Sequence, residues 1–375
     1  MTPIIIRPVT NKSELLQFIK FAWKVNKKDP NWVPPLMMDM LNRLNKEKNP
    51  FFKHSQVELF LAYRGAEIVG RIAAIDNKMH NDFHQDKVGF FGFLEAENDR
   101  EVFEKLLETA EDWLKKRGKD TILGPTNFST NDEIGFLIDG FDTPPFFMMT
   151  HNPRYYPEMM DSLGYQKAKD VYAYYIDQKS VVISDKLKQI SNANRERMNV
   201  KIRSVDMQHF DEELERVRTV YNNAWARNWG FVPLTPEEID FIAADFKRII
   251  DPELVLLAEI DGKPVGFLLA LPNYNEVFAK IKNGKLFPFG WIKFLTGKKK
   301  IKSMRVLTLG IIQQLQQSGL GALFYMEIIQ RGIKAGYQSA EMSWVLEDND
   351  LMNRAAQLLG GAPYKTYRLY SKPLS

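Results

Sequence analysis

The sequence contains no cysteine and few histidines, and each absence removes a class of function. Without cysteine among 375 residues there is no disulfide, no thiolate metal site and no cysteine nucleophile, which fits a reducing cytoplasm. The five histidines are scattered and form no HExxH pair. His80 and His84 share a helical spacing but lie in a polar segment, so we expect them to be exposed, and we predict no metal site.

Long apolar runs and a strong charge of one sign are also missing. No run reaches the roughly 20 residues of a membrane-spanning helix, and the N-terminus lacks the layout of a signal peptide. A net charge of +4 is too small to indicate nucleic acid and suits an anionic small molecule equally well. We predict a cytoplasmic globular protein without a transmembrane segment, and the length favours two domains.

The sequence repeats itself at a period of 196 residues. Val69-Gly70 and Leu163-Gly164 both recur 196 residues later, and so does Ile6-Arg7. Each half has a strand, early helices, an apolar hairpin, a key strand, a helix, a strand, a helix and closing strands. We therefore predict two tandem domains with the same mixed α/β fold, at residues 1–178 and 199–375. The polar linker 179–198 between them includes a short helix at 184–197.

Residues 305–331 are the most informative stretch of the second half. A β-rich run at 306–312 leads into a polar turn, Gln-Gln-Ser-Gly-Leu-Gly at 316–321, and then into an apolar pattern at helical spacing. A strand that enters a helix through such a turn leaves backbone N–H groups at the positive end of the helix dipole, which suits a phosphate. The turn matches neither a P-loop nor a three-glycine dinucleotide fingerprint, and it also fits an ordinary flexible connection.

This turn resembles the Gln/Arg-x-x-Gly-x-Gly/Ala pyrophosphate loop of the GNAT acyltransferases. Gln316, Gly319 and Gly321 stand at the matching positions, and Asn349 lies eleven residues before the glycine of the closing Leu-Gly turn, where that family contacts its coenzyme. The resemblance covers nearly the whole chain as two copies and implies an N-acyltransferase that transfers an acyl group directly to an amine. An N-acetyltransferase is the favoured form, with acetyl-CoA or a longer acyl-CoA as the cofactor. The cofactor-binding residues implied or predicted are Ile311, Gln316, Gln317, Ser318, Gly319, Leu320, Gly321, Ala322, Asn349 and Asn353.

The first copy lacks such a loop. A shift of 218 residues, set by the glycines 118 and 336, places Glu101 opposite Gly319 and Phe103 opposite Gly321. The corresponding segment, EAENDREVF, contains four acidic side chains, which satisfy the helix dipole internally and repel a phosphate. We predict that only the second half binds the cofactor.

The strand after the predicted cofactor helix, in the stretch AEMSWVLEDND that starts at Ala340, supplies the candidate base. Glu341 lies early in this strand among apolar residues, where burial would raise its pKa, although pairing with an arginine would give it a structural role. Ala356 stands where many GNAT enzymes have an acid tyrosine, so the resemblance leaves the general acid open. Tyr367 is our candidate acid, with Tyr364, Tyr325 or water as alternatives.

Two regions are candidates for the acceptor site. Trp225 and Asn228 belong to a predicted early helix of the second half and combine flat apolar surface with polar groups. Asn127 and Glu133 belong to a polar loop after a buried strand of the first half, and an ordinary packed connection explains that loop equally well. The acceptor is predicted to be a small-molecule amine or a peptide.

The second half carries an aromatic insertion at residues 274–303. It is rich in aromatic and aliphatic residues and ends in three consecutive lysines. An extra helical hairpin packed on the core, a lid over an acyl chain, and a contact with a membrane surface all fit this composition. Two further hypotheses for the whole chain also stay open: a non-catalytic binding protein on a GNAT scaffold, and a relative of aminoacyl-tRNA-dependent ligases.

Overall fold

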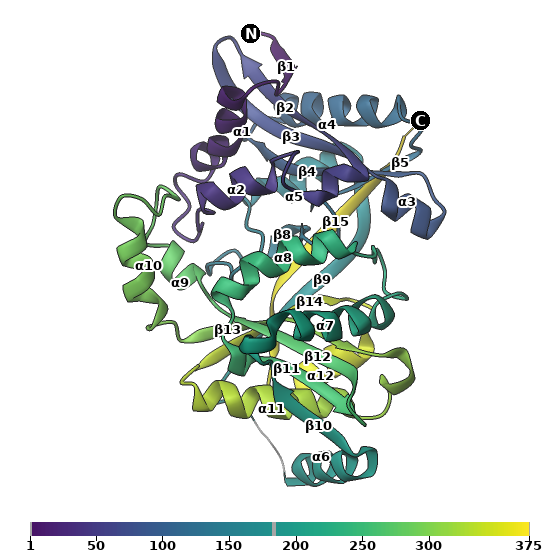
Figure 1. Ribbon diagram of the computed structural model, residues 1–375. Helices are drawn as coiled ribbons and strands as arrows, with labels where there is room; N and C mark the ends of the chain where they lie inside the picture. The colour runs from purple at the N-terminus through teal and green to yellow at the C-terminus, as the bar shows by residue number, and fades with distance from the viewer. Residues whose placement is uncertain (1, 182–184, 375) are drawn as a thin grey trace. The chain divides into compact units, whose positions relative to one another are not determined.

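The computed structural model describes residues 2–181 and 185–374, and this chain divides into two compact units (Figure 1). The first unit comprises residues 2–170, 278–294 and 365–374, and the second comprises 295–364 and the described part of 171–277. Each unit is therefore built mainly from one half of the sequence and includes a segment from the other half.

The sheet of the first unit follows the order of the chain. Its strands are, in spatial order, β1 (Ile4–Pro8), β2 (Ser55–Arg64), β3 (Glu67–Asn77), β4 (Val88–Ala96), β5 (Thr121–Gly124) and β15 (Ala362–Pro373), with β8 (Phe136–Asp139) also paired to β15. Neighbouring strands are antiparallel except β4 and β5, which are parallel. The short strands β6 (Thr126–Asn127) and β7 (Glu133–Ile134) form a separate pair.

Helix α4 builds the core of this unit. The helices are α1 (Lys12–Val25), α2 (Met37–Arg43), α3 (Lys78–His84), α4 (Arg100–Lys115) and α5 (Tyr155–Ser162), with a 3₁₀ turn, η1 (Pro50–Lys53). Val102, Leu106 and Leu114 of α4 repeat at helical spacing and are buried in one cluster with Ile72 of β3. These residues therefore lie on one buried face of α4.

The second unit has the same plan. Its strands run in the order β9 (Gln166–Asp177, from residue 171), β14 (Ser339–Leu346), β13 (Ser303–Ile311), β12 (Lys263–Pro272), β11 (Val255–Ile260) and β10 (Val200–Ser204). Again a single pair, β13 with β14, is parallel among these described strands, and helix α11 (Leu320–Lys334) connects its two members. The unit also contains α6 (Asp185–Met198), η2 (Met207–His209), α7 (Phe210–Ala224), α8 (Pro236–Ile249), η3 (Pro252–Leu254), α9 (Asn275–Phe278), α10 (Gly290–Lys298), η4 (Gln313–Leu315) and α12 (Asp350–Leu358), although α9 and α10 each continue into the first unit.

The sheet registers refine the internal repeat. Gly70 pairs with Ala96 in the first unit, and Gly266 pairs with Ile311 in the second. Ile311 therefore corresponds to Ala96, a shift of 215 rather than the 218 deduced from the glycines. The sequence alignment was wrong by three residues here because the connections after the two key strands differ in length.

The closing strand of each sheet comes from the other half of the chain. Residues 171–177 of β9, from the first half, pair with β14 in the second unit. Residues 370–373 of β15, at the C-terminal end, pair with β5 in the first unit. The mixed α/β fold in two copies is confirmed. The domain boundaries at residues 178 and 199 stay a prediction. Among the described residues, no helix is both long and apolar enough to cross a bilayer.

Candidate functional site

The turn between β13 and α11 is a defined loop. After β13 ends at Ile311, the chain makes the turn η4 and enters α11 at Gly319, which has a φ of +89°. Only glycine adopts this conformation without strain, and a Cβ there would lie 2.4 Å from the Asn194 side-chain nitrogen. Gly319 also has no side chain that could cap the helix. The first turn of α11 therefore begins with its backbone N–H groups uncapped by the preceding residue.

Side chains on both sides hold this loop in place. The Gln316 amide nitrogen donates to the carbonyl oxygens of Ala224 (2.9 Å) and Ile311 (3.2 Å). Ser318 Oγ donates to Leu315 O at 2.6 Å and accepts from Leu320 N at 3.3 Å. The Gln316 and Ser318 side chains, predicted to bind a cofactor, thus shape the loop, and its backbone is what remains for a ligand.

Helix α6 packs beside the same loop, in the segment predicted to be a linker helix. Arg197 Nη2 donates to Ser318 O at 3.2 Å, and Arg195 forms an ion pair with Glu327 of α11 at 2.5 Å. The predicted helix at 184–197 is confirmed over the described residues. Arg197 adds positive charge beside the turn, whereas the charge of Arg195 is paired with Glu327. The sequence analysis missed both contacts because a linker gave no reason to place these arginines there.

The ends of two parallel strands meet at this edge of the sheet. The pairing of β13 with β14 covers Ser303–Val306 against Ser339–Met342, whereas both strands continue beyond it. β13 leads to the glycine turn, and β14 leads to Asn349, the N-cap of α12, whose Oδ1 accepts from Met352 N at 3.2 Å. Open α/β sheets place ligands at such an edge, where the carboxyl ends of parallel strands lie together.

The side chain of Asn353 forms hydrogen bonds within the protein through both of its polar atoms. Its Oδ1 accepts from the Tyr174 hydroxyl at 2.8 Å, and its nitrogen donates to Leu346 O at 3.1 Å. Both polar atoms of its side chain therefore tie α12 to the neighbouring strands. Its predicted contact with the coenzyme stays a prediction.

A buried polar cluster lies where the β13–β14 pairing stops. Arg305 and Glu341 are register partners with 1% and 0% exposure, and Arg305 Nε lies 3.6 Å from Glu341 Oε1. Ser343 Oγ donates to Glu341 Oε1 at 2.6 Å and accepts from Arg305 Nε at 2.9 Å, and the Tyr364 hydroxyl donates to Glu341 Oε2. Burying a charge is costly unless it is paired, and this set pairs both charges.

The sequence context of Glu341, the candidate base, suggested apolar neighbours. In the structure its carboxylate lies among polar side chains instead. The arginine pairing that the sequence analysis left open is what the structure has. Arg305 was the missed residue, and an arginine in the middle of an apolar strand was the signal that could have found it. Glu341 as a base stays a prediction.

The candidate acids occupy different environments. Tyr364 bonds directly to Glu341 and is partly exposed. Tyr325 is buried, its hydroxyl contacts Met352 Sδ at 3.0 Å, and burial raises the pKa of this phenol. Tyr367 is fully buried in the first unit, where β15 pairs it with Leu137. Only Tyr364 and Tyr325 thus share a unit with the glycine turn.

Trp225 packs on the key strand of the second unit. A Cβ on Gly310 would lie 2.4 Å from Trp225 Cη2, and the indole is 5.6 Å from the Phe267 ring in an edge-on arrangement. Asn228 N donates to Trp225 O at 2.8 Å, which shapes the turn after α7. Trp225 therefore covers the strand that leads into the glycine turn, and the acceptor role of both residues stays a prediction.

Asn127 and Glu133 form a polar cluster in the first unit. Asn127 Oδ1 accepts from Phe93 N at 2.8 Å, and its nitrogen donates to Glu133 Oε2 at 3.0 Å. Arg43 Nη1 lies 3.0 Å from the same carboxylate oxygen. Burial raises the pKa of neighbouring Asp132 to about 6. The two predicted residues are thus brought together, within a network that also stabilises β6 and β7.

In the first unit, an acidic side chain caps the equivalent helix start. Asp99 is the N-cap of α4, and its Oδ1 accepts from Glu101 N at 3.0 Å. Arg64 Nη2 contacts Asp99 Oδ2 at 2.6 Å, and this hydrogen bond lowers the pKa of Asp99. The orphan donors of α4 are therefore satisfied internally.

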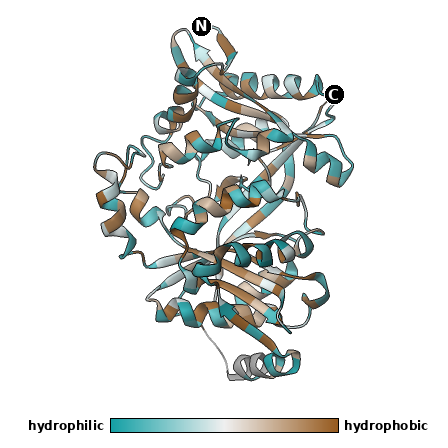
Figure 2. Cartoon of the chain, viewed as in Figure 1, coloured by the Kyte–Doolittle hydropathy of each residue, from teal (hydrophilic) through white to brown (hydrophobic). Residues whose placement is uncertain are grey.

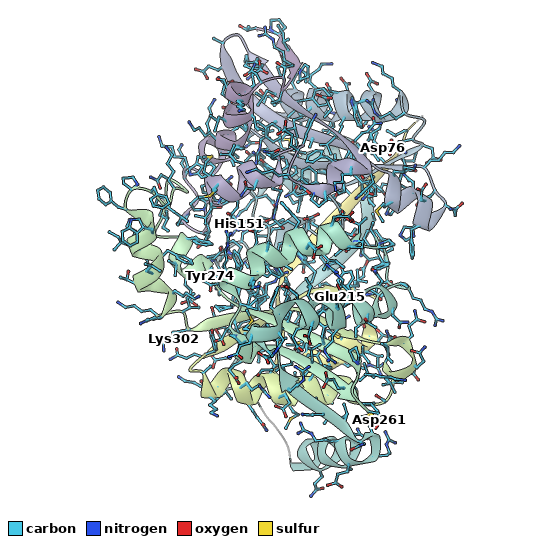
Figure 3. The ribbon with its side chains drawn as sticks, in the orientation of Figure 1. Asp76, His151, Glu215, Asp261, Tyr274 and Lys302 are labelled. Carbon is cyan, nitrogen blue, oxygen red and sulfur yellow. The ribbon has the colours of Figure 1, made fainter. Side chains whose placement is uncertain are left out.

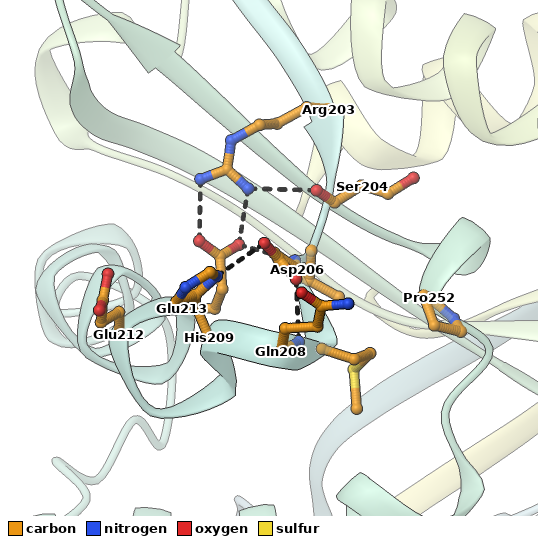
Figure 4. Close-up of a pocket in the computed structure, with 10 residues that line it drawn as sticks. Arg203, Ser204, Asp206, Gln208, His209, Glu212, Glu213 and Pro252 are labelled. Atoms are coloured by element: carbon orange, nitrogen blue, oxygen red, sulfur yellow. Dashed lines mark hydrogen bonds and ion pairs between the residues drawn. The ribbon is translucent and has the colours of Figure 1, made fainter.

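A surface pocket of about 660 Å³ lies elsewhere in the second unit, between the end of β10 and the start of α7 (Figure 4). Arg203 bonds to both carboxylate oxygens of Glu213, at 2.7 and 2.9 Å, and His209 contacts Asp206 at 2.8 Å. These charged groups neutralise one another, and the pocket contains none of the predicted site residues. We assign no ligand to it.

The expectation for the histidines was wrong for His80. It is buried at 4% exposure, its ring packs on Phe90, and burial lowers its pKa to about 4. His151, labelled in Figure 3, is bonded to Asp29 at 2.8 Å. Within residues 2–181 and 185–374, no group of three or more acidic or histidine side chains could hold a metal.

Comparison with known proteins establishes the family. The chain is 41% identical over 374 residues to the protein named Bacterial ceramide synthase of Caulobacter vibrioides (strain NA1000 / CB15N), which covers 98% of this chain and 97% of that one. It is 37% identical over 376 residues to Protein YghO of Escherichia coli K12, covering 99% and 95%. The chain belongs to the family of these two proteins. No protein-family model matches the sequence.

Comparison with solved structures shows that this chain has a tandem GNAT fold. A tandem GNAT protein from the clavulanic acid biosynthesis pathway has a TM-score of 0.59 at 12% identity, covering 100% of this chain and 99% of that one. A GCN5-related N-acetyltransferase from Sphaerobacter thermophilus has a TM-score of 0.54 at 12% identity, with coverage of 100% and 97%. At these identities the likeness concerns the fold alone, and the predicted GNAT resemblance is confirmed.

Proposed function

We propose that this protein is an N-acyltransferase that transfers a long acyl chain from acyl-CoA to the amine of a long-chain amino alcohol. The observation that carries the proposal is the 41% identity, over nearly the whole of both chains, to a protein named Bacterial ceramide synthase. A ceramide is the amide of such an amino alcohol with a fatty acid. The sequence prediction favoured an acetyl group, allowed a longer acyl chain and left the amine open. The proposal departs from that preference and commits to a long acyl chain.

In this proposal the coenzyme pyrophosphate binds at the start of α11. Gly319 has a positive φ and no side chain of its own, so the N–H groups of the first turn that Ser318 Oγ does not take form a backbone anion site. Arg197 supplies positive charge beside it. A Cβ added to Gly321 would lie 3.7 Å from Ile311 Cδ1. The first turn of α11 therefore packs on the end of β13 without crowding. Asn349 at the neighbouring helix start is the second contact that we propose.

The chemistry needs a proton acceptor and a proton donor. The amine nitrogen attacks the thioester carbonyl carbon, the new carbon–nitrogen bond forms as the carbon–sulfur bond breaks, the nitrogen loses a proton, and the departing thiolate gains one. Glu341 has no exposed surface, so we propose that it acts through the Tyr364 hydroxyl, which it orients. Arg305 is then a positioning residue that holds the carboxylate.

The test is a thiol-release assay with purified protein. Because the chain has no cysteine, the thiol of free coenzyme A can be followed with a thiol reagent without a protein background. We expect release with palmitoyl-CoA and sphinganine, and much less with acetyl-CoA, and mass spectrometry should find the N-acyl product. Binding of acyl-CoA without turnover of any amine would contradict the proposal and favour a non-catalytic scaffold.

A further inference from the structure

The segment at residues 277–302 concentrates the positive charge of the whole protein. It contains eight of the 51 lysine and arginine residues and none of the 47 acidic ones. The remainder of the chain, with 43 basic and 47 acidic side chains, is therefore net negative although the protein as a whole is net positive. Such a one-sided segment gives a strong local attraction for an anionic surface.

The same segment exposes large aromatic side chains. Phe287 and Phe289, in the loop before α10, are 68% and 71% exposed, and Trp291 and Ile292 in the first turn of α10 are also exposed. Figure 2 shows hydrophobic residues alternating with hydrophilic ones along α10 and the loop that precedes it. Exposed clusters of this kind, mixed with lysine, are typical of surfaces that enter the headgroup region of a bilayer.

The exposure does not result from a loose segment, because its base is fastened within the first unit. The Trp23 indole nitrogen donates to Lys282 O at 2.9 Å, and Met37 N donates to Gly284 O at 2.8 Å. Gly284 has a φ of +63°, and a Cβ there would lie 2.5 Å from Pro35 O. Met38, which follows Met37 in α2, is itself 51% exposed and adds apolar surface beside this attachment.

Internal packing separates inward from outward aromatic residues. Phe278 is buried, stacks on the Phe294 ring at 6.0 Å and contacts the Phe147 ring at 5.9 Å. Phe287 and Phe289 take no part in that packing and face outward. At the end of the segment, Glu276 accepts from Lys302 N and Ser303 N. Figure 3 labels Lys302, the last residue of the segment, and Tyr274, which precedes its start.

We propose that residues 277–302 form a docking surface for an anionic lipid bilayer. The aromatic tip enters the interface, and the lysines, including the run at 298–300, contact the negatively charged headgroups. This inference goes beyond the proposed reaction and does not depend on it. The lid and the packed hairpin, which the sequence left open, are the other roles that the test must exclude.

The test is co-flotation of the full-length protein with vesicles. Wild type should float with phosphatidylglycerol–phosphatidylethanolamine vesicles, float poorly with pure phosphatidylcholine vesicles, and lose binding as salt is raised to about 0.5 M. Phe287→Ser with Phe289→Ser should lower the partition coefficient about tenfold or more, because both rings leave the interface. Neutralising residues 298–300 to glutamine should lower binding at low salt only.

The matched control is Leu351→Ser with Leu358→Ser in α12, whose side chains are 64% and 75% exposed. It removes comparable exposed apolar groups outside the lysine-rich segment and should float like wild type. Failure of wild type to bind anionic vesicles would overturn the proposal, as would equal loss in the control. The proposal would also be overturned if the protein did not bind vesicles but formed a concentration-dependent dimer that Phe287→Ser with Phe289→Ser abolished. The exposed face would then be a contact between copies of the chain.

Discussion

The two units start equivalent helices in opposite ways. In the first, α4 begins at Asp99, whose carboxylate caps the helix and is held by Arg64. In the second, α11 begins at Gly319, which has no side chain, and positive charge from Arg197 lies beside the turn. One helix start carries its own anion, whereas the other is suited to receive one.

The comparison extends to the strands that precede these helices. The third register pair of β4 and β5 is Phe90 with Leu123, whereas the third pair of β13 and β14 is Arg305 with Glu341. The first unit has apolar packing where the second has a buried ion pair. A duplicated fold can therefore keep its architecture in both copies while a buried polar pair occurs at this position in only one of them.

The largest effect is expected from removing one partner of the buried ion pair. Glu341→Leu should lower the free energy of unfolding by about 3–5 kcal/mol, because Arg305 is left buried and uncompensated. Changing Arg305→Phe as well installs the pair found in the first unit and should restore most of that stability. Urea denaturation measures both variants.

Measuring acyl-transfer activity distinguishes a structural role of the Arg305–Glu341 pair from a chemical one. It should be lost in Glu341→Leu and should stay lost in the double variant, although the latter is stable. Recovery of activity together with stability would mean that Glu341 has a structural role alone.

The next effect concerns the second position of each helix, which is Glu101 in α4 and Gly321 in α11. Gly321→Glu makes α11 resemble α4, and the fold has room for it because an added Cβ meets Ile311 only at 3.7 Å. Acyl-CoA affinity should fall about 30–100-fold, since a carboxylate would lie beside the phosphates. Titration calorimetry measures this, with Tm as the check on folding.

The matched variant is Glu101→Gly in the first unit. It should leave acyl-CoA affinity unchanged, because we assign the coenzyme to the second unit. An equal loss there would place the cofactor with α4 instead. Gly319 is unsuited to this test, because its positive φ would strain any other residue.

A third prediction contrasts buried carboxylates. Glu341 has a full set of partners, whereas burial raises the pKa of Asp132 to about 6 despite Arg43 nearby. Its raised folded-state pKa means that the stability linked to its protonation is present below about pH 4 and lost as pH rises through 6. Asp132→Asn should therefore stabilise the protein by about 2 kcal/mol at pH 7.5 and have no effect at pH 4, as measured by urea denaturation. A pH-independent difference would contradict this origin.

The smallest effect is expected from the cap of α4. Asp99→Ala should cost about 1 kcal/mol, because the N–H of Glu101 loses its acceptor. The hydrogen bond from Arg64 lowers the folded-state pKa of Asp99, so this contribution is present above about pH 4 and disappears as pH falls below it. Thermal denaturation at pH 7 and pH 3 measures the difference. Acyl-CoA affinity should not change.

Local features were predictable because their causes are local. The apolar spacing of α4, the acidic residues at its start and the glycines of the turn at 316–321 each act within a few residues, through helix periodicity, capping and backbone freedom. The repeat at 196 residues showed that one plan occurs twice. The polar linker predicted the helix α6, but not that its arginines lie beside the glycine turn.

The sequence by itself therefore determined the elements, their duplication and the different character of the two helix starts. Only the tertiary structure decided that β9 and β15 close the sheet of the other half, and that Glu341 meets Arg305, Ser343 and Tyr364. These outcomes depend on strand register and on contacts between residues far apart in the chain. A shift of one residue in register would turn Glu341 to the opposite face, and no local pattern encodes that choice.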